Sequence, residues 1–314
     1  MSGSVAFDTI MVFQGRFGDH ILPEKTHLLN VAFLVDRLER RRGGTAANVA
    51  YTMALLGEHP LLCAAVGSAD FDAYAAALDA EGVDTSTMLR CEDIGTATAF
   101  ITTDMDGNQI TAFHPGAMSR ASGVDLSALQ DVSEVVVGAD DSAAMALHVE
   151  QAQGLGARLV FAPAQQIPAM PDDVLRRGLE RAWIIAGNDY ELEMIRERTG
   201  RSVHDLCTSA IVAVTKGARG SELHMPDGVA VIPPAAVPGV VDPTGAGDAF
   251  IAGLVTGFRA GAAPEVAGRM ASVAASFVVE HSGPQHHHFS RDEFRARYAA
   301  TFDGGEPPLP RGRA

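Results

Sequence analysis

The residues most able to do chemistry lie in one ten-residue string, VDPTGAGDAF, at positions 241–250. Gly245 and Gly247 flank Ala246, and an apolar helical pattern continues from the end of the string. Amides in the first turn of a helix have no partner within the helix, and the helix dipole favours a negative charge there. Because glycine lets the backbone approach a phosphate closely, the string predicts an anion site made by the main chain of these three residues.

Asp248 follows the glycine pair directly. A carboxylate beside an anion site repels the anion, so its presence there suggests a chemical role. Asp248 can accept a proton from a hydroxyl that attacks a phosphoryl group, as the catalytic-loop aspartate of protein kinases does. The simpler interpretation is structural, since Gly-Ala-Gly is a common way into a helix and aspartate is an ordinary first-turn residue. This short pattern alone does not separate the two interpretations.

Four further motifs share one setting, the junction between a predicted strand or loop and the helix or turn that follows it: Asp8; Gly43, Gly44 and Asn48; Asn188 and Glu191; Thr215, Gly217 and Gly220. Each motif also has a purely structural explanation. Asp8 can be a turn former and the Gly43–Gly44 pair a helix entry. Asn188 with Glu191 can be a capping box, and the stretch from Thr215 to Gly220 can be a β-turn. The histidines at 281 and 286–288 have no acidic partner at helical spacing, so we predict no metal site there.

Taken whole, the string at 241–250 resembles the second signature of the PfkB family of carbohydrate and nucleoside kinases, also called the ribokinase family. The chain is similar to that family from Asp8 to about Phe289, with both family signatures in the same order. Within the family it looks most like the bacterial adenosine and nucleoside kinases, to which four stretches are similar: residues 3–11, 16–23, 109–117 and 283–285.

The resemblance implies roles on the acceptor side of the site. It makes Asp248 the catalytic base, next to the amides of Gly245, Ala246 and Gly247. It assigns the small-molecule substrate, a nucleoside or a sugar, to Asp8, Gly43, Gly44, Asn48 and Phe113. A carboxylate at Asp8 that accepts from two vicinal hydroxyls selects a cis-diol. Phe17 is the alternative to Phe113 for stacking near a base, and either ring can instead belong to the core of the lid.

The resemblance also implies ATP and Mg²⁺ as cofactors. It assigns them to Asn188, Glu191, Thr215, Gly217 and Gly220. Glu191 is the residue expected to order Mg²⁺, through water, because Mg²⁺ often keeps part of its hydration shell. The stretch 282–285 is expected to form a loop beside the adenine pocket. Whether a monovalent cation is required stays open.

The order of predicted elements indicates an α/β fold. Strand–helix alternation after residue 135 predicts a doubly wound, mostly parallel sheet. The turn residues 106–108 between two β-branched runs predict a hairpin outside that sheet. The resemblance implies a ribokinase-like fold in which this hairpin belongs to a small β lid. We expect a core over 1–11, 36–94 and 119–301, a lid over 12–35 and 95–118, and a disordered tail over 302–314.

The composition narrows the possible partners. The 314 residues carry a formal net charge of −15, so we expect no nucleic-acid binding, and the basic run 37–42 is interpreted as the solvated end of a helix. No apolar run reaches membrane-spanning length, and the first residues lack a signal-peptide pattern. With only three, sparse cysteines, the sequence predicts a cytoplasmic protein with reduced thiols, without a membrane partner. We expect a monomer or a homodimer.

The expected function is adenosine kinase-like: transfer of the ATP γ-phosphoryl group to the ribose 5′-hydroxyl of a purine nucleoside. The alternative is a sugar kinase of the same family, since Arg16, Lys25 and Arg90 near the lid can meet a sugar phosphate. A less favoured alternative is a non-catalytic nucleoside sensor. Ala162 and Ala164 stand where related kinases often have Asp and Gly, which can weaken a hydrogen-bond network near the phosphates.

Overall fold

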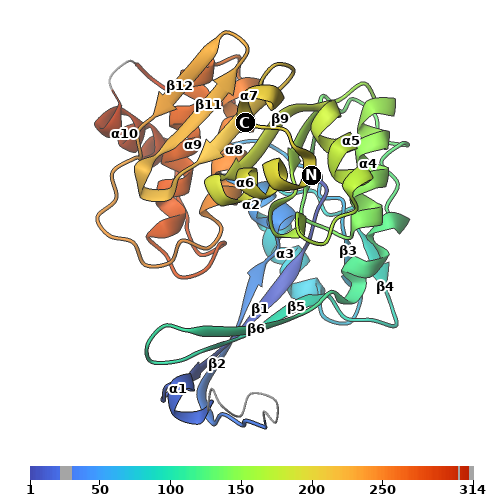
Figure 1. Ribbon diagram of the computed structural model, residues 1–314, viewed down its shortest axis with the longest axis vertical. Helices are drawn as coiled ribbons and strands as arrows, with labels where there is room; N and C mark the ends of the chain where they lie inside the picture. Colours follow the sequence, from blue (N-terminus) through green and yellow to red (C-terminus); the bar gives the residue numbers. More distant parts are fainter. Residues whose placement is uncertain (22–29, 303–304, 311–314) are drawn as a thin grey trace.

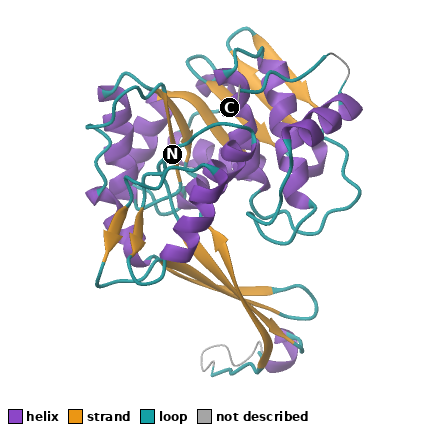
Figure 2. Cartoon of the chain, turned by 180° about the vertical axis from the view of Figure 1, so that it is seen from behind, coloured by secondary structure: helices purple, strands orange, loops and turns teal. Residues whose placement is uncertain are grey.

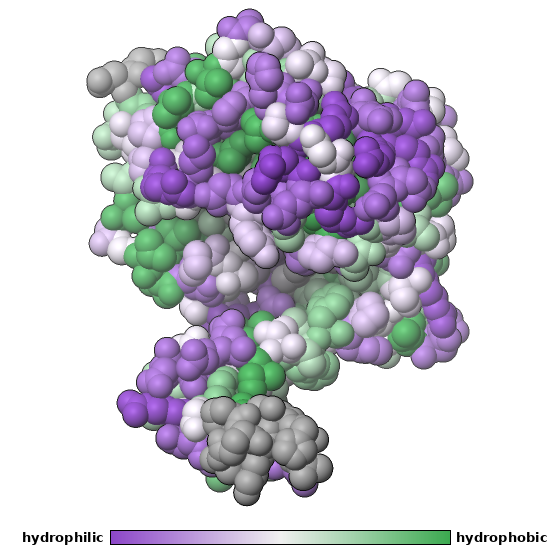
Figure 3. Space-filling view, viewed as in Figure 1, coloured by the Kyte–Doolittle hydropathy of each residue, from purple (hydrophilic) through white to green (hydrophobic). Residues whose placement is uncertain are grey.

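The computed structural model describes residues 1–21, 30–302 and 305–310. The main body is a layered α/β structure from which a smaller sheet projects (Figure 1). The face turned to the viewer is mainly polar over the body, and apolar residues gather where the smaller sheet leaves it (Figure 3). None of the described helices is both long enough and apolar enough to span a membrane.

The larger sheet has six strands in the order β12-β11-β10-β9-β8-β7. They are β7 (Glu134–Gly138), β8 (Arg158–Ala162), β9 (Ala182–Asn188), β10 (Ile211–Thr215), β11 (Ser221–Met225) and β12 (Gly228–Ile232). Strands β7 to β10 pair in parallel, and β11 and β12 add an antiparallel hairpin at one edge. The prediction of a mostly parallel sheet is confirmed. Isolated bridges from Ser2 to Val137 and Cys63 extend it past β7.

Both faces of this sheet are buried, because its parallel strands are apolar on both sides. Along β7, Val135 and Val137 pack on one face and Val136 on the other. The first face carries α4 (Ser142–Gly154), α5 (Asp172–Arg181) and α6 (Asp189–Thr199), and the second carries α2 (Thr45–Leu55), α8 (Ala246–Arg259) and α9 (Pro264–Val279). Figure 2 shows helices on either side of the strands. The predicted doubly wound arrangement is therefore confirmed.

The remaining elements are short or lie at the periphery of the body. They are α1 (Phe17–His20), α3 (Asp72–Glu81), α7 (Val203–Leu206), α10 (Arg291–Thr301), the parallel pair β3 (Ala65–Gly67) and β4 (Leu89–Cys91), and 3-10 turns at Gly116–Gly123, Ala164–Gln166 and Gly217–Arg219. The helix α3 ends at Gly82, whose φ of 94° satisfies a left-handed C-cap.

The projecting sheet has the order β2-β1-β5-β6, formed by β1 (Ala6–Phe13), β2 (Val35–Gly43), β5 (Ala97–Thr103) and β6 (Gln109–His114). The hairpin predicted around residues 106–108 joins β5 to β6. The predicted lid boundaries need correction, because β1 and β2 lie in this sheet over their full length. Residues 6–11 and 36–43 therefore belong with the lid sheet. Residues 22–29 of the predicted lid lie outside the described residues.

The basic run 37–42 is part of strand β2, so its interpretation as a helix end was wrong. Its side chains find partners that only the folded sheet provides. The guanidinium of Arg40 lies 3.5 Å from the ring centroid of Phe7 on β1, and Arg41 Nε donates to Glu39 at 2.9 Å. Cross-strand pairing and cation–π contact thus outweigh the low strand propensity of the run.

The tail also differs from the prediction. Phe302 is buried in the core cluster that contains Tyr298, and Leu309 packs against the same cluster. Residues 303–304 and 311–314 of the predicted tail lie outside the described residues. The described part of the tail is therefore packed, because two apolar side chains in a Gly/Pro-rich run reach the core.

Candidate active site

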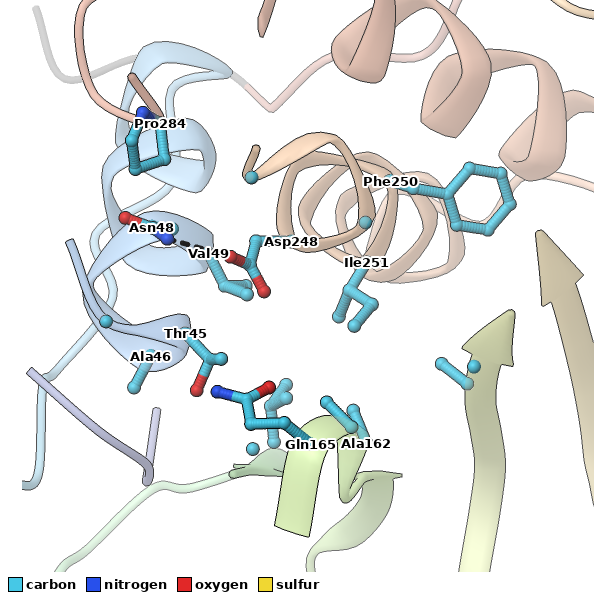
Figure 4. A pocket seen from close by; sticks show the side chains of 18 of the residues that line it. Thr45, Ala46, Asn48, Val49, Ala162, Gln165, Asp248, Phe250, Ile251 and Pro284 are labelled. Atoms are coloured by element: carbon cyan, nitrogen blue, oxygen red, sulfur yellow. Dashed lines mark hydrogen bonds between the residues drawn. The ribbon is translucent and has the colours of Figure 1, made fainter. Parts of the chain in front are cut away.

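A cavity of about 330 Å³ opens at the carboxyl ends of the parallel strands. Its wall includes the last residue of each of these strands: Gly138, Ala162, Asn188 and Thr215. Open α/β sheets bind ligands at this edge, where the connecting loops leave a crevice. The starts of helices α2 and α8 also line the cavity (Figure 4).

A second cavity of about 460 Å³ adjoins the first and shares Thr215, Gly247 and Phe250 with it. Gly217 and Gly220, both predicted on the nucleotide side, line this second cavity. The predicted Ala246 also lines this cavity. Most of the other wall residues are apolar or small and were not predicted, and they include Pro234, Ala235, Val237, Val240, Ser272, Ala275, Ser276 and Val279. The run of small residues on α9 was the available signal in the sequence.

The predicted anion turn lies between the two cavities. Gly245 is the N-cap of α8 with a φ of 84°, a conformation that favours glycine. The amide of Ala246 donates to Pro243 O at 3.1 Å and is therefore engaged within the turn. The amides of Gly245, Gly247 and Asp248 donate to no other residue in the described part of the chain. Three unpaired donors at a helix start are an arrangement that can bind an anion.

Asp248 faces the first cavity and is partly buried. Asn48 Nδ2 donates to its Oδ2 at 2.8 Å, the dashed line in Figure 4. Burial raises the pKa of Asp248 to about 7; the Asn48 bond lowers it, while the charges of Glu191 and Asp8 raise it. A carboxyl group with a pKa near neutrality is well matched to accept a proton at physiological pH.

Asp8 lines the same cavity beneath the turn between β2 and α2. Burial raises its pKa, Arg41 lowers it and Asp242 raises it. A Cβ at Gly43 would lie 2.7 Å from Asp8 Oδ2, and one at Gly44, whose φ is 96°, would lie 2.6 Å from Ser4 O. The glycine pair therefore lets the chain pass close over β1 and the Asp8 carboxylate.

Gly43, which packs on Asp8, is not among the residues that line the first cavity, and neither is the predicted substrate residue Phe113. Phe113 lies on β6 opposite Ala99 and is 49% exposed. Phe17 packs with its ring centroid 6.0 Å from that of Phe13 and 5.0 Å from that of Phe33. The ring of Phe17 therefore belongs to the core of the lid sheet, which was the alternative to stacking near a base.

Asn188 and Glu191 form the predicted capping box at the start of α6. Glu191 N donates to Asn188 Oδ1 at 2.8 Å, and Asn188 N donates to Glu191 Oε2 at 2.9 Å. Both residues line the cavity, and burial raises the pKa of Glu191. Its Oε1 accepts from no described residue, so this oxygen is available to a hydrated cation.

The described residues contain no group of three or more His, Cys, Asp and Glu side chains that could hold a metal ion. A divalent ion beside Glu191 would therefore take most of its ligands from water and phosphate oxygens. Mg²⁺ is commonly bound in this way, through one or two carboxylates together with substrate phosphates. The donor set here fits that pattern.

Residues 6–289 match the pfkB family carbohydrate kinase domain. The chain belongs to this family. Its members are phosphotransferases that act on hydroxyl acceptors, and this pfkB kinase is such an enzyme. The ten-residue string at 241–250 and the glycine pair before Asn48 therefore lie within a kinase domain.

The relatives of this pfkB kinase agree with its architecture. A nucleoside kinase of Methanothermobacter thermautotrophicus is 33% identical over 287 residues, 89% of this chain and 91% of the relative. The Burkholderia thailandensis nucleoside kinase in complex with inosine superposes with a TM-score of 0.88, at 36% identity over 98% of each chain. The same protein in complex with ADP-inosine gives a TM-score of 0.86, at 38% identity over all of this chain and 98% of that one.

The structure gives Gln285 contacts that the sequence did not predict, and it brings Tyr74 and Gln165 to the site, which the sequence did not single out. Gln285 was expected beside the adenine pocket, but its Nε2 donates to Asn48 Oδ1 at 2.8 Å and to Tyr74 Oη at 2.5 Å. The adjacent Pro284 lines the first cavity, and Gln165 points into it without a partner among the described residues (Figure 4). The stretch 283–285 was singled out only by the resemblance. For Tyr74, the sequence indicated no more than a place on the buried face of its helix.

Ala164 follows β8 at the cavity wall with a φ of 44°, which is uncommon for a residue other than glycine. We expect Ala164→Gly to raise the free energy of unfolding of the pfkB kinase by about 1 kcal/mol, because a left-handed L-residue costs roughly 1–2 kcal/mol. Urea denaturation measures the change. Ala169→Gly is the matched control, since Ala169 is exposed in the same loop without a positive φ. A free energy of unfolding that falls equally in both variants would contradict backbone strain at Ala164.

Proposed function

We propose that this pfkB kinase transfers the γ-phosphoryl group of ATP to the ribose 5′-hydroxyl of a purine nucleoside. The arrangement at Asp248 carries the proposal: its carboxylate accepts a 2.8 Å hydrogen bond from Asn48 and adjoins amides that have no partner in the described chain. A nucleoside acceptor is favoured by the similarity to the Burkholderia thailandensis kinase in complex with inosine.

The acceptor side of the first cavity suits a ribose. Asp8 offers two carboxylate oxygens to the vicinal 2′- and 3′-hydroxyls, which orients the ring in the cavity. Gly43 and Gly44 keep the surrounding space free of side chains, since a Cβ on Gly43 would lie 2.7 Å from Asp8 Oδ2. The ring held in this way presents its primary hydroxyl to Asp248.

The transfer step is an in-line displacement at the γ-phosphorus. Asp248 accepts the proton of the 5′-hydroxyl as its oxygen forms the new bond to phosphorus, and the bond from phosphorus to the β-phosphate oxygen breaks to release ADP. The amides of Gly245 and Gly247 stabilise the charge on the equatorial oxygens. Asn188 and Glu191 are the residues that would hold Mg²⁺, which offsets charge on the phosphates.

An ADP-release assay with ATP and Mg²⁺ tests the proposal. We expect inosine, adenosine or guanosine to stimulate ADP release strongly, cytidine less, and ribose or fructose 6-phosphate little. The acceptor position is tested with 5′-deoxyadenosine, which lacks the hydroxyl and should give no release. A sugar that exceeds every nucleoside would establish the sugar-kinase alternative, and nucleoside binding without ADP release would establish a sensor.

The pH dependence of the reaction provides a separate prediction. Asp248 acts as a base only when ionised, and its pKa is raised to about 7. We therefore expect kcat/KM for adenosine to fall about tenfold for each pH unit below 7 and to level off above it. Initial rates between pH 5 and 9 measure the profile. A plateau that extends down to pH 5 would contradict a base with the raised pKa of Asp248.

A further inference from the structure

A chain of hydrogen bonds lies on the side of Asn48 that faces away from Asp248. Tyr74 Oη donates to Gly43 O at 2.8 Å, and Gln285 Nε2 donates both to Tyr74 Oη at 2.5 Å and to Asn48 Oδ1 at 2.8 Å. Tyr74 and Gln285 are each 2% exposed, and Asn48 is 5% exposed. We call this chain, from Gly43 through Tyr74 and Gln285 to Asn48, the amide relay.

The relay has a fixed direction, because it begins at a backbone carbonyl that can only accept. Tyr74 must donate to Gly43 O, and burial raises the pKa of the Tyr74 hydroxyl, so it keeps its proton. The hydroxyl can then only accept from Gln285, which must present its NH₂ group. The same nitrogen donates to Asn48 Oδ1, so the NH₂ group of Asn48 is left facing Asp248.

We propose that Tyr74 and Gln285 are positioning residues, which hold the Asn48 amide with its donor on the carboxylate of Asp248. The proposal rests on the proposed function, in which Asp248 is the base. With the Asn48 amide turned over, a carbonyl oxygen would face the carboxylate and repel it. The relay therefore lowers the pKa of Asp248, against the effect of burial, and keeps the carboxylate aligned.

Stability alone does not account for Gln285. Its Oε1 is buried and has no hydrogen-bond partner in the described structure, a costly state for a polar atom. An apolar side chain of similar length would avoid this cost. The two hydrogen bonds donated by Nε2 are what the glutamine provides, and both belong to the relay.

Few charged groups act on the titratable residues at the two ends of the relay. Asp248 is influenced by Asp8 on β1 and Glu191 on α6, in addition to the Asn48 bond from α2. The Tyr74 hydroxyl is influenced by Arg42 on β2 and by the same two aspartates, Asp8 and Asp248. Replacing Gln285 by an uncharged side chain leaves all these charges in place, so the effect of such a change on the pH profile reports the relay.

Gln285→Met and Gln285→Glu test the relay through the pH profile of the full-length enzyme with ATP and adenosine. The methionine removes both donors, so we expect kcat to fall about tenfold and the acid limb of kcat/KM to move up by roughly half a pH unit or more. An ionised glutamate attracts the Asn48 NH₂ group to itself and also adds a negative charge near Asp248, so we expect a larger shift in the same direction. The uncharged methionine variant separates the loss of the relay from this charge effect.

Tyr51→Phe is the matched control. Tyr51 is a buried tyrosine whose hydroxyl donates to His287 O at 2.8 Å in the same loop, but it makes no bond to the relay. We expect this variant to lose stability without moving the acid limb. If Gln285→Met does not fold, Tyr74→Phe replaces it, with a smaller upward shift expected.

The outcomes separate the two proposals. An acid limb that stays in place in the Gln285 and Tyr74 variants, or that moves equally in Tyr51→Phe, would overturn the relay while leaving the proposed function intact. Absence of nucleoside-dependent ADP release by the wild-type enzyme would overturn the proposed function instead. An upward shift confined to the relay variants supports the relay.

Discussion

Asp248→Asn lowers kcat at least 100-fold while the chain keeps its fold. Asparagine has the shape of the carboxyl group and its oxygen can still accept the bond that Asn48 donates, but it cannot take up the proton of the attacking hydroxyl. A positioned general base contributes about 10²–10⁴-fold to the rate. ADP release at pH 8, with saturating ATP and adenosine, measures the loss, and near-normal turnover would remove Asp248 from the mechanism.

The stability of the same variant provides its control. The pKa of Asp248 is raised from 3.8 to about 7 in the folded state, so the fold favours the neutral carboxyl group. Its contribution to stability is complete below pH 4 and is lost as the pH rises through 7. We therefore expect ligand-free Asp248→Asn to be at least as stable as the wild type at pH 8. A large destabilisation there would assign the lost turnover to misfolding.

Gly245→Ala lowers the free energy of unfolding by roughly 2–4 kcal/mol, from left-handed strain and overpacking together. Gly245 has a φ of 84°, and a Cβ there would lie 2.4 Å from the Cβ of Pro284 and 3.0 Å from its Cα. The proline ring is rigid, so the loop that carries Pro284 must move away from α8. Thermal and chemical denaturation of the ligand-free protein measure the effect.

Gly247→Ala is the control within the same turn. Gly247 has no positive φ, and a Cβ there would have no atom within 4 Å among the neighbours considered. We expect its stability to stay unchanged or to rise by up to about 1 kcal/mol, as for glycine to alanine in a helix. Equal losses in the two variants would show that the crowding at Pro284 is not the cause.

Much of the architecture follows from local patterns. The apolar runs that become β7 to β10 are buried on both faces, and the alternation with helices indicated a doubly wound sheet. The capping box of Asn188 and Glu191 and the helix start at Gly245 depend on residues within four positions of one another. Rules for such short-range features can be applied to a sequence directly, because the interacting residues are neighbours in the chain.

The strand β2 and the position of Phe113 depend on more than local patterns. The charged run 37–42 pairs with β1, and that pairing depends on residues about 30 positions away. Phe113 was expected near the base only through the family resemblance, and it lies on a strand at the edge of the lid sheet with half its surface exposed. Strand pairing and the direction of a side chain are properties of the assembled sheet.

The amino-acid sequence by itself determined the anion turn, the carboxylate that follows it and the class of fold, because each depends on neighbours along the chain. Only the tertiary structure decided what surrounds that carboxylate. Asn48 reaches Asp248 across 200 positions, and Gln285 reaches Tyr74 across 211. Contacts of this kind exist only after the sheet and its helices have packed, so no spacing in the sequence encodes them visibly.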